Sequence, residues 1–156
     1  KKTLKLVILI FLKDLLQKVI DCPEINICIL SERSLSDLKS ILSPLENITM
    51  AGSHGMELKL ANEDEIECCE QACVFKPKVA ELAQELRENV CGHGGQVDQK
   101  VFHVTFNWRE TNPNFKMMMI QKAKEIINKH GFQSTNGHFC VEARPPIGWD
   151  KGIIIH

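Results

Sequence analysis

The chain has 156 residues, of which 44% are hydrophobic and 25% are charged, and its formal net charge is -1. This length allows one ordinary domain, or a small domain beside part of another, with a sizeable buried core. The composition excludes a disordered chain, and the balanced charge gives no basic surface for binding nucleic acid.

The most apolar run, LKLVILIFL at residues 4–12, lies near the start of the chain, and Lys5, Lys13 and Asp14 interrupt or bound it. It is too short to span a bilayer. Two lysines precede it, as in a signal peptide, but no small-residue cleavage site follows. We therefore expect a buried strand or the start of a helix, and no membrane contact.

The next segments predict an α/β arrangement. Residues 13–21 place leucine, valine and isoleucine at helical spacing, and residues 25–30 are almost wholly apolar, as in a strand buried on both faces of a parallel sheet. Ser34 can cap a helix over residues 34–42. Residues 47–58 then give another strand, which ends in a turn punctuated by glycines.

The pattern changes after an acidic, irregular stretch at residues 61–72. Two segments have the apolar spacing of amphipathic helices. The extended segments lie in two pairs, and each pair should form an antiparallel hairpin, because its two members are too close in sequence for a crossover connection. The second hairpin should turn around Asn136 and Gly137, a strong turn dipeptide. In order, these elements are a helix at 78–90, strands at 96–100 and 101–108, a helix at 114–130, and strands at 132–136 and 138–144.

Two different layers follow from this order. We expect an α/β core built from residues 1–74 and 144–156, with an α+β unit at residues 75–143 inserted into it.

The seven cysteines are an odd number, without the dense spacing of a secreted disulfide framework. Cys68, Cys69 and Cys73 form a cluster that suggests a metal site. No second pair of cysteines or histidines follows at a zinc-finger distance, so ordinary thiols are the preferred interpretation and no metal ligand is assigned. The thiols predict a reducing, cytoplasmic environment.

Ser31 and Lys151 are candidates for a phosphate site. Ser31 follows a predicted parallel strand, at the end of the sheet where α/β proteins bind ligands. Lys151 follows a rigid double proline in EARPPIGWDKG and opens an apolar run, so it can lie at a helix N-terminus, which favours anions. The alternatives are a capping or loop serine and a solvated surface lysine.

Glu142 and Arg144 lie two residues apart on a predicted strand and therefore share a face. They can form a simple surface ion pair. They also offer an acceptor and a five-donor fork, which suits a polyhydroxylated ligand such as a sugar. The stretch GSHG allows close backbone approach at its glycines and presents His54 between them.

Four motifs occur along the chain in the order ILSERSLSDLK, AGSHGMEL, TFNWRE and VEARPPIGWDKG. In this order they resemble the trehalose-6-phosphate phosphatase family of the haloacid dehalogenase superfamily, and within it the phosphatase-like part of arthropod trehalose-phosphate synthases. The resemblance covers about residues 13–156 and implies a Rossmann-like core with a mobile cap, Mg²⁺ as the cofactor of the complete enzyme, and trehalose 6-phosphate as the substrate. The remainder of a synthase polypeptide is a possible partner.

The resemblance implies catalytic roles for Ser31 and Lys151, which would bind and neutralise the transferring phosphoryl group. Sugar-binding roles are implied for six residues: His54, Glu57, Lys100, Arg109, Glu142 and Arg144.

The sequence also departs from the family pattern. It contains no Asp-x-Asp nucleophile motif, the acidic metal motif expected after Lys151 is not reached, and Glu32 replaces a glycine. We therefore expect a fragment that lacks the nucleophile and is inactive by itself. The alternative is a non-catalytic remnant that binds a sugar phosphate or a protein.

Overall fold

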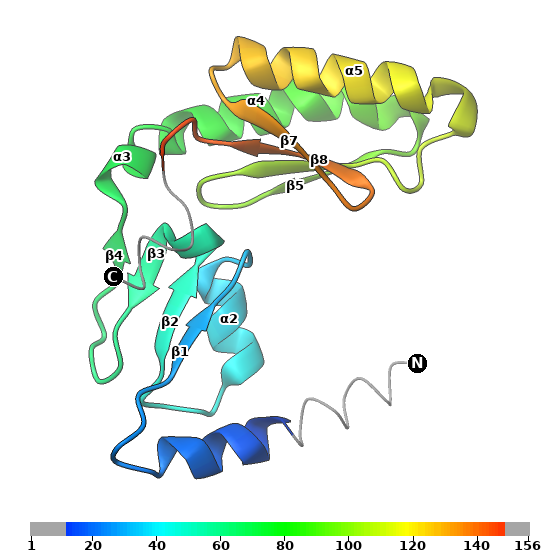
Figure 1. Cartoon of the computed structure of the whole chain (residues 1–156). Helices are drawn as coiled ribbons and strands as arrows, with labels where there is room; N and C mark the ends of the chain where they lie inside the picture. The colour runs from blue at the N-terminus through cyan, green and yellow to red at the C-terminus, as the bar shows by residue number, and fades with distance from the viewer. Residues whose placement is uncertain (1–11, 149–156) are drawn as a thin grey trace. The chain divides into compact units, whose positions relative to one another are not determined.

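The computed structural model describes residues 12–148. The chain divides into two compact units, and within the described range the first comprises residues 12–68 and the second residues 69–148. Helix α3 (Glu70–Cys73) therefore lies in the second unit, whereas the sequence interpretation placed it in the core. Figure 1 shows the helices and strands of both units.

Within the described residues, the first element of the first unit is a helix over residues 12–20, which confirms the helix predicted at residues 13–21. Its sheet has the strand order β1-β2-β3-β4, in which β1 and β2 are parallel and the other two pairings are antiparallel. The elements are β1 (Cys28–Leu30), α2 (Leu35–Leu42), β2 (Thr49–Gly52), a 3-10 turn (Ser53–Gly55), β3 (Glu57–Lys59) and β4 (Glu67–Cys68).

Helix α2 forms where the capping pattern predicts it. The hydroxyl of Ser34 accepts a hydrogen bond from the amide of Asp37, which satisfies one of the unpaired donors of the first turn. Leu35, Leu38 and Leu42 recur at helical spacing and are buried, so this face of α2 forms the core of the first unit.

The prediction of a strand buried on both faces at residues 25–30 was wrong. Strand β1 has only three residues, Cys28 is exposed, Ile25 is 48% exposed, and Ile29 and Leu30 are half-buried. Within the described residues β1 pairs only with β2, because it lies at the edge of the sheet. The apolar composition alone could not reveal this, since burial also requires neighbours on the other side.

In the second unit α4 (Lys76–Val90) and α5 (Pro113–Lys129) cover one face of an antiparallel sheet with the order β5-β6-β8-β7 (Figure 1). The two predicted helices and two predicted hairpins are confirmed. The strands are β5 (Gln96–Gln99), β6 (Val104–Asn107), β7 (Gln133–Gly137) and β8 (Cys140–Arg144).

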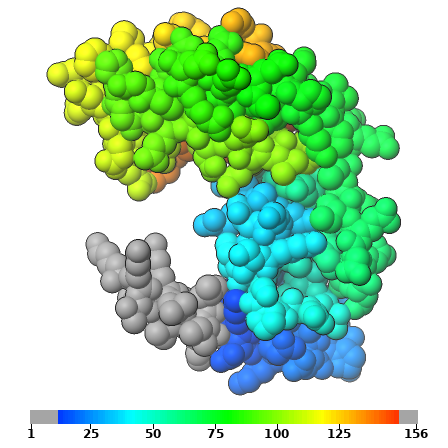
Figure 2. All heavy atoms as spheres, turned by 180° about the vertical axis from the view of Figure 1, so that it is seen from behind, coloured from blue at the N-terminus to red at the C-terminus, as the bar shows by residue number. Residues whose placement is uncertain are grey.

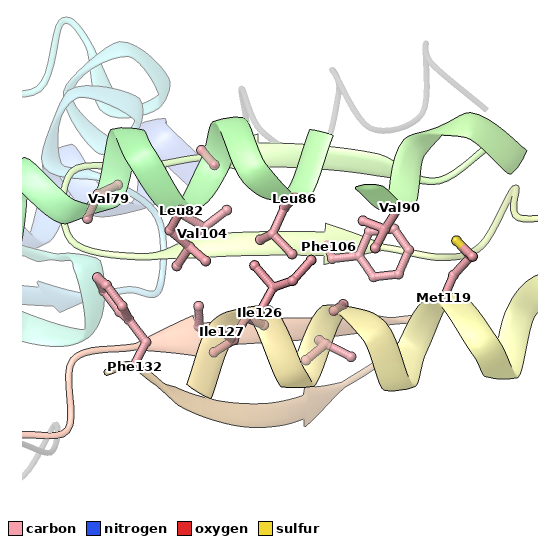
Figure 3. Close-up of a cluster of buried hydrophobic side chains, with 14 residues drawn as sticks. Val79, Leu82, Leu86, Val90, Val104, Phe106, Met119, Ile126, Ile127 and Phe132 are labelled. Carbon is pink, nitrogen blue, oxygen red and sulfur yellow. The ribbon is translucent and has the colours of Figure 1, made fainter. Parts of the chain in front are cut away.

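The core of this unit lies between the helices and the sheet. Figure 3 shows Leu82 and Leu86 of α4 and Ile127 of α5 pointing toward Val104 and Phe106 of β6. All five are fully buried. In Figure 2, atoms of α4 (green) and of α5 (yellow) lie on the visible face of the second unit.

The second hairpin turns two residues later than predicted. Gly137 pairs with Cys140, so Asn136 belongs to β7 and the loop consists of His138 and Phe139. Phe139 adopts a left-handed φ of 60°. The centre of its ring lies 5.2 Å from the centre of the Trp108 ring, and its carbonyl accepts a hydrogen bond from the Trp108 amide. Tertiary packing of this aromatic side chain overrode the local preference of the Asn-Gly pair.

Among residues 12–148, no helix is both long enough and apolar enough to cross a membrane.

Candidate phosphate-binding and sugar-binding residues

Ser31 follows the last residue of β1, at the carboxyl end of the parallel pair β1 and β2. It is not the helix cap, which is Ser34. Its Oγ accepts from the amide of Arg33 at 3.1 Å, in a local turn. Because this bond uses only a lone pair, the hydroxyl proton can still be donated to an anion. The structure thus places Ser31 where open α/β sheets bind ligands.

Three backbone hydrogen bonds hold the loop after β1, one to strand β2 and two to the loop after β2. The amide of Ser31 donates to the carbonyl of Ala51 at 2.9 Å, and the amide of His54 donates to the carbonyl of Ser31 at 3.0 Å. The amide of Ser53 donates to the carbonyl of Arg33 at 2.6 Å. Ser31 and His54, predicted separately from two motifs, are therefore brought together by backbone contacts.

The loop after β2 has an unusual backbone. Ser53 and His54 have φ values of 51° and 60°, in the left-handed region that residues with a Cβ rarely adopt. Both side chains are buried, Ser53 completely and His54 to 5% exposure. Two consecutive residues of this kind persist only where surrounding contacts hold them, and such strain concentrates at functional sites.

Gly52 allows the end of β2 to approach the start of α2. A Cβ at this position would lie 2.4 Å from the backbone nitrogen of Leu35 and 2.8 Å from its Cα. Glycine is therefore required here by the close approach of the two backbones. Its backbone conformation is not the reason, since its φ of -99° is an ordinary extended value that any residue adopts. Glu57, opposite Gly52 in the β2–β3 ladder, is buried at 7% exposure.

The described residues around Ser31 do not form a site suited to Mg²⁺. This ion prefers several oxygen ligands and is usually held by one or two carboxylates. The buried carboxylate of this region is Glu57, whose Oε2 already accepts from the hydroxyl of Ser53 and the amide of Leu35. Glu32 is exposed on the loop surface.

In the second unit Glu142 and Arg144 lie on β8, on the sheet face opposite the helices, since Val141 and Ala143, which alternate with them along the strand, face the core. Arg144 donates to Oε2 of Glu142 from both Nε, at 2.7 Å, and a terminal nitrogen. Glu142 is 15% exposed and Arg144 is 35% exposed. The pair therefore presents a fixed acceptor beside guanidinium donors.

His103 is a further member of this group that the sequence did not single out. Its Nε2 lies 3.6 Å from Oε1 of Glu142, while Arg144 occupies the other carboxylate oxygen. His103 is buried to 4% exposure in the connection between β5 and β6. No sequence motif marks it, because its proximity to Glu142 depends on the pairing of β6 with β8.

Lys100 and Arg109 are placed at different parts of this sheet. Lys100 follows β5 and forms an ion pair with Asp98 at 3.3 Å. Arg109 lies beyond the other end of β6, where its guanidinium stands 4.9 Å from the centre of the Phe139 ring. Lys116 stands 4.0 Å from the centre of the Trp108 ring, so the two contacting rings, Trp108 and Phe139, each have a cation beside them.

Lys151, the second predicted phosphate-binding residue, lies outside the described residues. Arg33 is an additional cation near Ser31 that was not predicted from the sequence as a site residue. It lies two residues after Ser31 and is exposed, and its presence in the same SERS motif was the available signal.

Comparison with known proteins gives consistent matches. A family model described as trehalose-phosphatase matches residues 5–156. The chain is 31% identical over 137 residues to a trehalose-phosphate phosphatase of Mycobacterium ulcerans, covering 87% of this chain and 34% of that protein. It is 28% identical over 134 residues to an uncharacterized glycosyl hydrolase of Mycobacterium tuberculosis, covering 84% of this chain and 10% of that protein.

Two solved structures show a related fold. A trehalose-6-phosphate phosphatase related protein matches with a TM-score of 0.76 at 22% identity, over 94% of this chain and 60% of that chain. The C-terminal domain of Candida albicans trehalose-6-phosphate phosphatase matches with a TM-score of 0.65 at 20% identity, over 88% of this chain and 48% of that chain. The predicted fold class, an α/β core with an α+β unit, is confirmed.

Proposed function

The chain belongs to the trehalose-phosphatase family, and on this premise we propose that it provides phosphoryl-binding and sugar-binding parts of a trehalose-phosphatase domain. It spans 34% of the Mycobacterium ulcerans relative. The observation that carries the proposal is the fixed position of Ser31. Backbone bonds to Ala51 and His54 hold it at the carboxyl end of β1, with its hydroxyl proton available to a phosphoryl oxygen.

We assign sugar recognition to the second unit. Glu142 and Arg144 combine a carboxylate acceptor with guanidinium donors, which is the combination that sugar hydroxyls use. Lys100 and Arg109 add cations to the same unit. The proposed ligand is trehalose 6-phosphate, and the first unit together with Lys151 would hold its phosphate group.

The chain by itself is proposed to lack phosphatase activity. Phosphoryl transfer of this class needs a carboxylate in line with phosphorus, a proton donor for the leaving oxygen and a metal ion. Ser31 and Lys151 supply only electrostatic stabilisation. The sequence contains no Asp-x-Asp pair, and the described carboxylates near Ser31 do not fit Mg²⁺.

The test incubates the purified chain with trehalose 6-phosphate and Mg²⁺ and measures inorganic phosphate. We expect no release above the buffer blank, for the wild type and for Lys151→Ala alike. A calorimetric titration should show weak binding of trehalose 6-phosphate that Ser31→Ala and Arg144→Ala reduce, and weaker binding of trehalose. Turnover that Lys151→Ala abolishes would refute the proposed inactivity, and absent binding would refute the ligand.

The second candidate function is a non-catalytic module that binds a sugar phosphate or a protein. Glu32 favours it, because a carboxylate replaces glycine beside the proposed phosphate site. The adjoining coding sequence discriminates the two candidates: an in-frame Asp-x-Asp motif upstream and an acidic motif downstream would support the enzyme, with the rest of a synthase polypeptide as partner. We also propose a cytoplasmic location, because none of the seven cysteines forms a disulfide in the structure.

A further inference from the structure

Glu57 is a buried carboxylate for which the resemblance implies contact with the sugar, yet its contacts in the structure are internal. Its Oε2 accepts from the hydroxyl of Ser53 at 2.5 Å and from the amide of Leu35 at 3.2 Å. Three segments therefore meet at one oxygen: strand β3, the loop after β2 and the first turn of α2.

The two donors at this contact suit a carboxylate oxygen as their acceptor. The first amides of a helix have no partner within the helix and carry partial positive charge, which favours an anion. Ser34 satisfies the amide of Asp37, and Glu57 satisfies that of Leu35 from another strand. Hydrogen bonds to a charged group are stronger than neutral ones, especially when both partners are buried.

This contact also acts on the loop that carries Ser31. Ser53 is held by its side chain to Glu57 and by its backbone amide to the carbonyl of Arg33. Ser53 and the following His54 both have left-handed φ values, which need external contacts to persist. His54 in turn donates from its backbone to the carbonyl of Ser31. A release of Ser53 would therefore be transmitted to Ser31 through these backbone bonds.

We propose that Glu57 is a positioning residue: it fixes the left-handed turn at Ser53 and His54 to the start of α2, and so sets the geometry of the loop that carries Ser31. The consequence for phosphate binding rests on the proposed function of Ser31. The effect on the loop itself does not depend on it.

The experiment uses the whole ¹⁵N-labelled chain and measures amide hydrogen exchange in Glu57→Gln, which keeps the shape of the side chain and removes its charge. We expect the amides of Ser53 and His54 to exchange at least tenfold faster than in the wild type, with exchange in β6 and β8 unchanged. Glu57→Asp keeps the charge and should recover part of the protection.

Leu42→Ala is the matched control, because Leu42 is buried at the far end of α2. It should destabilise the first unit without a preferential effect at Ser53 and His54. Equal protection of these two amides in Glu57→Gln and in the control, at matched stability, overturns the proposal. If Glu57→Gln does not fold, Ser53→Ala removes one donor, leaves the carboxylate in place, and should give the same local pattern.

A second readout is titration with inorganic phosphate, followed at the amide of Ser31. Glu57→Gln should weaken binding at least fivefold more than Leu42→Ala. If Glu57→Gln and the control bind equally, the positioning role is refuted. If the wild type binds no phosphate, the proposed function of Ser31 fails, and the exchange rates at Ser53 and His54 decide whether Glu57 sets the loop.

Discussion

Replacement of Gly52 by alanine is the most direct test of how the first unit is assembled. The added Cβ would lie 2.4 Å from the nitrogen of Leu35 and 2.8 Å from its Cα. Ordinary van der Waals contact begins at 3.4 Å, so β2 and α2 must separate by roughly 1 Å. The clash involves backbone on both sides, and a change of side-chain rotamer cannot relieve it.

The magnitude has two parts. Overpacking of this kind costs about 1–3 kcal/mol. Displacement of Leu35 also stretches its hydrogen bond to Glu57, and an unsatisfied buried donor costs about another 1–3 kcal/mol. A total of about 2–6 kcal/mol is a large part of the stability of a typical small domain. The φ of Gly52 adds no strain, because -99° suits any residue.

Amide hydrogen exchange resolves the effect by unit. Gly52→Ala should accelerate exchange throughout β2 and α2 and leave the amides of α4 and α5 unchanged. Gly92→Ala is the control, because a Cβ there meets no atom within 4 Å, and its effect should stay within about 0.5 kcal/mol. If the amides of β2 and α2 exchange at the same rate in Gly52→Ala as in the wild type, these two elements do not approach each other as closely as the structure shows.

Three further predictions concern the second unit. Leu86→Ala empties a fully buried position and should lower the free energy of unfolding by about 2–5 kcal/mol in urea titrations; a loss below 1 kcal/mol would contradict the packing. Hydrogen bonds from Lys129 and His130 lower the pKa of Glu85 below its usual value of 4.5. The ionised Glu85 carboxylate therefore stabilises the fold above pH 4.5, and this stabilisation is lost as the pH falls through the pKa of Glu85 in the folded state. Glu85→Gln should therefore unfold more easily at pH 6 and match the wild type in strong acid, whereas an equal loss at both pH values would refute the linkage. Gly131→Ala, at φ 78°, should cost about 1 kcal/mol by thermal denaturation, and an unchanged Tm would refute the strain.

Local sequence determined the elements that depend on short-range patterns. Leucines at helical spacing and the Ser34 cap specify α2, and the apolar stripe over residues 78–90 specifies α4. The glycines after α4 and α5 adopt the left-handed conformation that ends a helix, with φ of 95° at Gly94 and 78° at Gly131. The placement of Ser31 at the end of a strand and the shared face of Glu142 and Arg144 also follow from local periodicity.

Tertiary structure decided the features that depend on partners distant in the chain. The exposure of β1 is set by its neighbours in the sheet, and the hairpin turn at Phe139 is set by packing on Trp108. The approach of His103 to Glu142 requires the pairing of two strands about forty residues apart.

The contacts of Glu57 show the same limit at the candidate phosphate site. The sequence identifies an acidic residue in a glycine-rich motif, which suits a ligand contact as well as an internal one. Its hydrogen bond to the amide of Leu35 crosses from β3 to α2 and exists only once both elements are packed. A buried carboxylate takes its role from the donors that surround it, and those donors are brought together by the fold.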